Sequence, residues 1–158
     1  MRTFTRVLMT ASLIAAAFGG VALAQESKGK SLHLKDLPPN VQKTVQDTLK
    51  GGEIKTIGKE KENGIEQYEI ETTLNGKARD FNVGVDGRLL VVEEAVTLDA
   101  IPGAAKAAIL KKVGGGTLAT VETFAKPGQA LLYEAAYKDV RGKHHEVLVN
   151  ADGKEVKE

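Results

Sequence analysis

Carboxylates and histidines are the side chains of this sequence that could carry chemistry, because the chain contains no cysteine. Glu69 and Glu71 lie two positions apart in "EQYEIETT", and Glu134 lies at the matching point of "LLYEAA". A carboxylate pair can act as general acid and base when one pKa is raised, which requires a pocket that excludes water. Residues two apart share one face of a strand. We interpret these acids as a solvated strand face or a partner-binding face, and we predict no catalytic residue.

The three histidines offer a metal site only weakly. His33 precedes the first predicted helix in a polar lead-in, and His144 and His145 are adjacent on a predicted strand, so their side chains point to opposite faces. His144 shares its face with Glu146, but zinc sites take three or four protein ligands. We therefore predict no metal and no cofactor. The His144–Glu146 pair is the basis of an alternative function, a periplasmic protein that binds or senses a small ligand or a metal.

Two amphipathic helices and several strands must position these residues. Each helix follows a proline, Pro38 or Pro102, and has an apolar side chain at every fourth position. Glycines follow both helices, at 51–52 and at 114–116, and favour helix termination. Most of the remaining sequence alternates between apolar and polar residues, which predicts strands. The residues predicted to face the core from the helices are Val41, Val45, Leu49, Ala105, Ile109 and Val113.

Asn-Gly and Asp-Gly pairs mark predicted hairpins. Asn75-Gly76 and Asp86-Gly87 suit a two-residue type I′ turn, in which both central residues have positive φ. Asp152-Gly153 repeats the second signal near the C-terminus, before the charged segment "KEVKE". We therefore expect a further strand after each Asp-Gly pair. A calcium loop would need more oxygen ligands at alternate positions, and none follows Gly87.

The two halves of the chain resemble one another at an offset of 64 residues. Leu37-Pro38 aligns with Ile101-Pro102, and one insertion later Tyr68-Glu69 aligns with Tyr133-Glu134. Ordered matches through helix, turn and strands favour an internal repeat. We predict an α+β fold of two tandem helix-plus-antiparallel-four-strand repeats, residues 34–94 and 95–158. The helices are expected on one face of the sheet, and the opposite face is expected to be open to solvent.

The N-terminal sequence predicts export. Arg2 and Arg6 precede an uncharged apolar run that ends in "ALA" at 22–24, which is typical of a signal peptide cleaved before Gln25. Removing residues 1–24 takes two basic residues and no acid, so the net charge changes from +1 to −1. That balance gives no support to a nucleic-acid partner. We expect a flexible lead-in at 25–33, no membrane anchor after cleavage, and a periplasmic or secreted protein.

These features together resemble tandem PepSY-like domains, small exported modules related in fold to the β-lactamase inhibitor protein. The resemblance rests on the leading "LP", the glycine stops, the "YEIE" and "YEAA" strands and the "DG" hairpins, over residues 34–158. It implies a non-catalytic module that binds a protein or peptide on its open sheet face, with a peptidase-inhibitor-like role as one version. The residues that we assign to partner binding are Glu69, Glu71, Glu134, His144 and Glu146.

Overall fold

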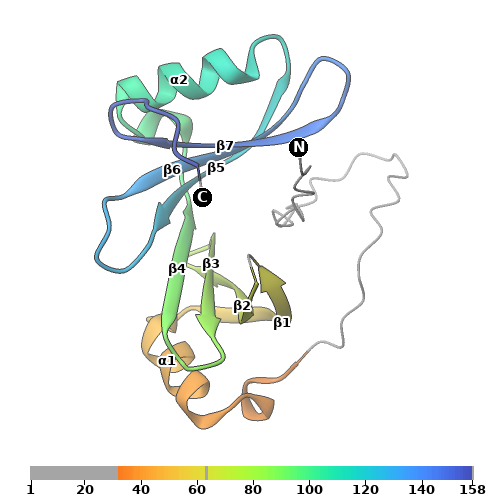
Figure 1. Cartoon of the computed structure of the whole chain (residues 1–158), viewed down its shortest axis with the longest axis vertical. Helices are drawn as coiled ribbons and strands as arrows, with labels where there is room; N and C mark the ends of the chain where they lie inside the picture. Colours follow the sequence, from red (N-terminus) through yellow and green to blue (C-terminus); the bar gives the residue numbers. More distant parts are fainter. Residues whose placement is uncertain (1–31, 63, 158) are drawn as a thin grey trace.

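The computed structural model describes residues 32–62 and 64–157. Seven antiparallel strands form a single sheet in chain order, and the two α-helices lie at opposite ends of it (Figure 1). Helix α1 contacts β2 and β3, whereas α2 contacts β6 and β7. The elements are η1 Leu34–Asp36, α1 Pro39–Leu49, β1 Glu53–Glu62, β2 Ile65–Leu74, β3 Lys77–Gly84, β4 Leu89–Ala95, η2 Leu98–Ala100, α2 Gly103–Val113, β5 Thr117–Ala125, β6 Leu132–Lys138 and β7 His144–Asn150.

The predicted fold class is wrong. The protein is mostly β, and it does not consist of two tandem helix-plus-four-strand repeats, because four strands follow α1 and three follow α2 within one sheet. The strand expected after Asp152-Gly153 is reduced to an isolated bridge between Val149 and Glu155. That segment contains one apolar residue, Val156, so it lacks the alternating apolar side chains that hold a strand against a core.

The amphipathic patterns of the two helices predicted the core correctly except at Leu49, which is only partly buried. Val41 and Val45 of α1 and Ala105 and Ile109 of α2 are each fully buried. The α1 side chains belong to a cluster with Ile57, Tyr68, Ile70, Phe81 and Val83, and the α2 side chains belong to a second cluster with Val121, Ala135, Val147 and Val149. Each helix therefore covers its own part of the sheet.

Strand register shows which residues share a face. Ile70 lies opposite Phe81, and Phe81 lies opposite Val92, so these three side chains form a row beneath α1. The ladder from β4 to β5 continues the same face, on which Val121 lies opposite Ala135 beneath α2. The residues between these positions point to the opposite side, which we call the helix-free face.

The predicted turns are partly correct. Asn75 and Gly76 both have positive φ, +53° and +77°, which confirms the type I′ turn between β2 and β3. At Asp86-Gly87 only the glycine has positive φ, so the type I′ prediction is wrong there. The Asp86 carboxylate accepts the N–H of Arg88 at 3.0 Å instead and holds a longer turn. This turn lies against α1, because a Cβ on Gly87 would be 2.9 Å from the Asn40 amide nitrogen.

The predicted signal peptide, residues 1–24, lies outside the described residues, as does most of the lead-in at 25–33. Where the description begins, the N–H of Leu32 donates to the carbonyl of Ile57 at 3.1 Å, so this part of the chain lies beside β1. No helix in the described ranges has the length and apolar character needed to cross a membrane. The boundaries at 34–94 and 95–158 stay a prediction.

Candidate functional site

The structure places all five predicted partner-binding residues on the helix-free face. Glu69 and Glu71 lie on β2, beside Gly58 and Thr56 of β1. Glu134 lies on β6, and His144 and Glu146 lie on β7. Three strands separate β2 from β6, so these residues form two groups at opposite ends of one surface.

Further acids fill the space between the two groups. Asp80 lies directly opposite Glu93 across β3 and β4, and Glu122 lies directly opposite Glu134 across β5 and β6. Each of the seven strands therefore contributes at least one carboxylate to the helix-free face. We call this set the carboxylate track; its members are Glu60, Glu69, Glu71, Asp80, Glu93, Glu122, Glu134 and Glu146. Like charges opposed across strands are unfavourable, so the fold alone does not explain the track.

Burial and mutual repulsion raise pKa values along the track. Desolvation is the largest cause of raising the pKa of Glu93 to about 9, and the charges of Glu134 and Glu122 add to it. Desolvation followed by the charge of Glu60 raises the pKa of Glu69 to about 7. Desolvation, with repulsion from nearby acids, also raises the pKa of Asp80 and that of Glu122. At neutral pH Glu93 is therefore protonated and Glu69 is close to half-protonated.

Two buried amides on the helix-free face have different environments. The Gln67 amide nitrogen donates to Glu60 at 2.8 Å and to Glu62 at 2.9 Å. Asn82 is 4% exposed and lies between Glu69 and Val91, and its amide nitrogen has no hydrogen-bond partner among the described residues. One oxygen of the Glu93 carboxyl group likewise has none there. Buried polar atoms are normally paired, so both atoms indicate a ligand or solvent position.

The helix-free face is not uniformly open to solvent, which corrects the prediction. Val91, Phe124 and Leu148 are 4%, 1% and 9% exposed, and the partly buried Leu132 and Val156 pack against them. We call these five residues the apolar stripe. It runs from β4 to β7 beside the carboxylate track, and the ammonium of Lys126 lies 5.1 Å from the centre of the Phe124 ring. The face thus combines apolar and acidic groups.

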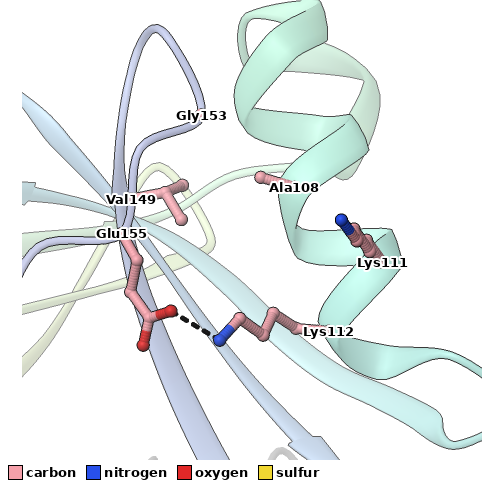
Figure 2. A pocket seen from close by; sticks show the side chains of 6 residues that line it. All are labelled: Ala108, Lys111, Lys112, Val149, Gly153 and Glu155. Carbon is pink, nitrogen blue, oxygen red and sulfur yellow. Dashed lines mark ion pairs between the residues drawn. The ribbon is translucent and has the colours of Figure 1, made fainter.

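A cleft lies on the other side of the sheet, the side that the helices cover. It has a volume of about 300 Å³ and lies between α2 and the turn after β7 (Figure 2). Lys112 and Glu155 form an ion pair of 2.5 Å across it, while Lys111 lies higher on α2. The cleft contains none of the predicted site residues, and its ion pair leaves no convergent acid, base and nucleophile.

The structure gives the metal alternative no support. The described residues contain no group of three or more histidine, cysteine, aspartate or glutamate side chains arranged to hold an ion. His145 points to the helix side, where its ring stacks on Tyr137 at 5.3 Å and its Nε2 lies 3.1 Å from the Asp139 carboxylate. His144 and Glu146 remain a two-residue set, and the metal-binding function stays a prediction.

Sequence reasoning missed Asp80, Asn82, Glu93 and Phe124. The first two were accessible, because Phe81 and Val83 were assigned to the core and their neighbours must point away. Glu93 and Glu94 are adjacent, so alternation alone does not say which of the two lies on the helix-free face with the other acids. Phe124 was hidden because an apolar residue on the helix-free face breaks the simple apolar-in, polar-out pattern.

Comparison of the fold with solved structures gives consistent neighbours. A DUF2874 family protein from Bacteroides ovatus is 15% identical with a TM-score of 0.60, and the match covers 77% of this chain and 85% of that one. A candidate periplasmic protein from Bacteroides eggerthii is 15% identical with a TM-score of 0.63, covering 77% and 86%. A BLIP-like protein from Bacteroides fragilis is 14% identical with a TM-score of 0.56, covering 77% and 84%.

At these identities the likeness shows a shared fold. No family model matches the sequence, and no curated protein matches it either. The likeness to a BLIP-like protein supports the part of the sequence resemblance that concerns the fold. Membership of the PepSY-like family stays a prediction.

Proposed function

We propose that this chain is an exported, non-catalytic binding module that holds a protein or peptide against its helix-free face. The observation that carries the proposal is the carboxylate track, which places an acid on every strand of a face covered by neither helix. The apolar stripe lies beside it and supplies contact area of the kind found in protein interfaces. The five residues assigned from the sequence lie on this face.

The fold neighbours are compatible with such a role. One is named for its likeness to the β-lactamase inhibitor protein and another as a candidate periplasmic protein. Together with the predicted signal peptide they support a periplasmic or secreted location. A peptidase-inhibitor-like activity is the narrower form of the proposal, and it would be measured against a panel of secreted peptidases and β-lactamases.

Affinity capture with matched variants tests the proposal. Mature protein would be used to capture partners from a periplasmic extract, in parallel with Glu71→Lys, Glu134→Lys and the control Asp47→Lys. Asp47 lies on α1 with a side chain 64% exposed and an ion pair only to Lys43. We expect both track variants to lose the captured protein and the control to keep it. Capture that survives both track variants would remove the helix-free face as the binding surface.

A further inference from the structure

The unpartnered atoms of the helix-free face restrict the chemistry of its ligand. The carboxylates attract cations, whereas the Asn82 amide nitrogen is a hydrogen-bond donor that needs an acceptor. Asn82 is buried to 4% exposure directly beside Glu69, and it lies two residues along β3 from Asp80, on the same face. A ligand that satisfies this face must therefore present positive charge and a neutral acceptor close together.

Three simpler ligands fail that requirement. A polyamine carries donors but no acceptor, so it would leave the Asn82 amide nitrogen unpaired. A divalent metal ion needs a compact ligand set, and the described residues contain none. A free amino acid brings a carboxylate, which the track would repel. A lysine- or arginine-containing peptide meets both needs, because its side chains are cationic and its backbone carbonyl groups are neutral acceptors.

We propose that the helix-free face binds an extended basic polypeptide segment, with cationic side chains on the carboxylate track and a backbone carbonyl accepting the Asn82 amide. This inference rests on the proposed function and names the chemistry of its partner. Seven strands about 4.8 Å apart span about 29 Å, which an extended segment of about nine residues covers. The apolar stripe provides a surface for the aliphatic parts of lysine and arginine side chains.

Proton release accompanies this binding. A docked cation favours the charged form of a nearby carboxyl group and lowers its pKa. Glu93 and Glu69 are wholly or partly protonated in the free protein at neutral pH, so they lose protons when the segment binds. The charged groups facing them are Glu60, Glu62, Glu71, Asp80, Glu122 and Glu134, with Lys126 beside Phe124.

Isothermal titration of the mature protein tests the proposal with defined probes. The probes are an acetylated, amidated nona-lysine peptide, the matching nona-glutamate peptide, spermine and calcium chloride. We expect the lysine peptide to bind more tightly than spermine and calcium, the glutamate peptide not to bind, and the measured heat to vary with the ionisation enthalpy of the buffer. That variation reports the protons released.

Two variants separate specific recognition from general attraction to an acidic surface. Asn82→Ala should weaken the affinity for the lysine peptide about tenfold, because one hydrogen bond to a buried group is lost. The affinity for spermine should not change. Glu93→Gln should weaken the binding of both the lysine peptide and spermine and should reduce the number of protons released. Asp47→Asn should change neither the affinities nor the proton release. Circular dichroism and a thermal melt would establish that each variant is folded.

The remaining outcomes overturn the inference in distinguishable ways. Equal affinity for spermine and peptide with no effect of Asn82→Ala would mean a non-specific cation surface. Tight calcium binding abolished by Glu93→Gln would mean an ion site. If the lysine peptide does not bind while affinity capture still depends on Glu71 and Glu134, the basic chemistry is wrong and the proposed function survives. If neither assay depends on the track, both proposals fail.

Discussion

Glu93 is the residue at which the structure most clearly departs from an ordinary solvated sheet. It lies among Glu134, Glu122, Asp80 and Glu69, and burial is the largest cause of its pKa near 9. Between its ordinary value of 4.5 and that value, the folded protein keeps a proton that the unfolded chain has released. Folding stability therefore falls as pH rises through this range, and the contribution of Glu93 to the free energy of unfolding is greatest below pH 4.5.

Replacing Glu93 with glutamine should remove most of that dependence. At pH 8 we expect Glu93→Gln to raise the free energy of unfolding by on the order of 5 kcal/mol, because a neutral amide needs no proton uptake. At pH 4 the variant and the original protein should be nearly equal. Urea unfolding at intervals from pH 4 to 9 measures the difference. A residual slope should remain, because the pKa values of Glu69, Asp80 and Glu122 are also raised.

The exposed acid Asp47 is the control for this measurement. Asp47→Asn should shift the whole stability curve by a small constant and leave its slope unchanged over the same range. A Glu93→Gln curve parallel to that of the original protein would show that Glu93 is already ionised in the folded state.

Individual residues show where sequence reasoning succeeds. Glu69 follows from strict alternation once Ile70 is placed in the core, and the same alternation around Phe81 would have placed Asp80, which was missed. The pKa of Glu93 does not follow, since it depends on burial in the assembled sheet and on acids as distant along the chain as Glu134. Side-chain burial on the helix-free face is a property of the assembled sheet, and local sequence patterns do not predict it.

At the scale of elements, one buried arginine joins α1 to the sheet. Arg79 of β3 is 4% exposed, and its guanidinium donates to the carbonyl of Thr48 near the end of α1 at 2.9 Å. Its Nε lies 3.9 Å from the Glu94 carboxylate. A helix leaves its last carbonyl groups without partners inside the helix, so this contact satisfies a group that burial would otherwise leave unpaired.

Arg79→Met keeps most of the side-chain volume and removes the donor. We expect the free energy of unfolding to fall by about 1–3 kcal/mol, since a buried carbonyl group loses a charge-assisted partner. Chemical denaturation followed by circular dichroism measures this loss. Arg88→Met is the matched control, because the Arg88 side chain is 80% exposed and pairs only with Asp86 in its own turn. An equal effect of the two substitutions would exclude the proposed link between α1 and β3.

The turn after β7 docks on α2 through a glycine. Gly153 has φ of +77°, and a Cβ there would lie 2.5 Å from the Ala104 carbonyl oxygen. Gly142 has φ of +79° with open space around it. Both alanine variants carry the backbone strain of positive φ, about 1 kcal/mol, but only Gly153→Ala also meets the helix. We expect this contact to lower the free energy of unfolding of Gly153→Ala by a further 1–3 kcal/mol or so.

Thermal or urea unfolding of the two alanine variants checks this difference. Equal destabilisation would show that the turn can move away from α2 at little cost. The pair also explains the limits of the sequence prediction. The Asp-Gly signal located the turn at Asp152-Gly153 correctly, but the contact of that turn with α2 is a tertiary feature that turn chemistry does not encode.

At the scale of the whole molecule, acids are concentrated on the helix-free face although the net charge is small, and Lys126 and Lys138 also lie on that face. The carboxylate track occupies the helix-free face, whereas Lys43, Lys106, Lys111 and Lys112 lie on the two helices. Net charge therefore did not predict the acidic surface, because the charges of the whole chain sum to +1. Binding of a basic segment to such a face should weaken with added salt, since exposed charges are screened over about 8 Å at physiological ionic strength.

The two halves of the sheet meet at a narrow joint. Strands β4 and β5 pair over four positions, from Val92–Ala125 to Ala95–Glu122. On the helix-free face Phe124 of β5 packs with Val91 and Leu148, and it is 1% exposed. The clusters beneath α1 and α2 are separate from this group. The apolar stripe is therefore the side-chain contact that joins the first half to the second.

Phe124→Ala should weaken that joint more than it weakens either half. We expect the free energy of unfolding to fall by about 3–5 kcal/mol, as for other buried phenylalanines. Under increasing denaturant, the amides of β2 and β7 in this variant should lose protection from exchange at different concentrations, whereas in the original protein we expect both strands to lose protection together. Phe124→Leu retains much of the buried volume and should keep a single transition. Coincident loss of protection in Phe124→Ala would mean that the β4–β5 ladder alone makes the sheet cooperative.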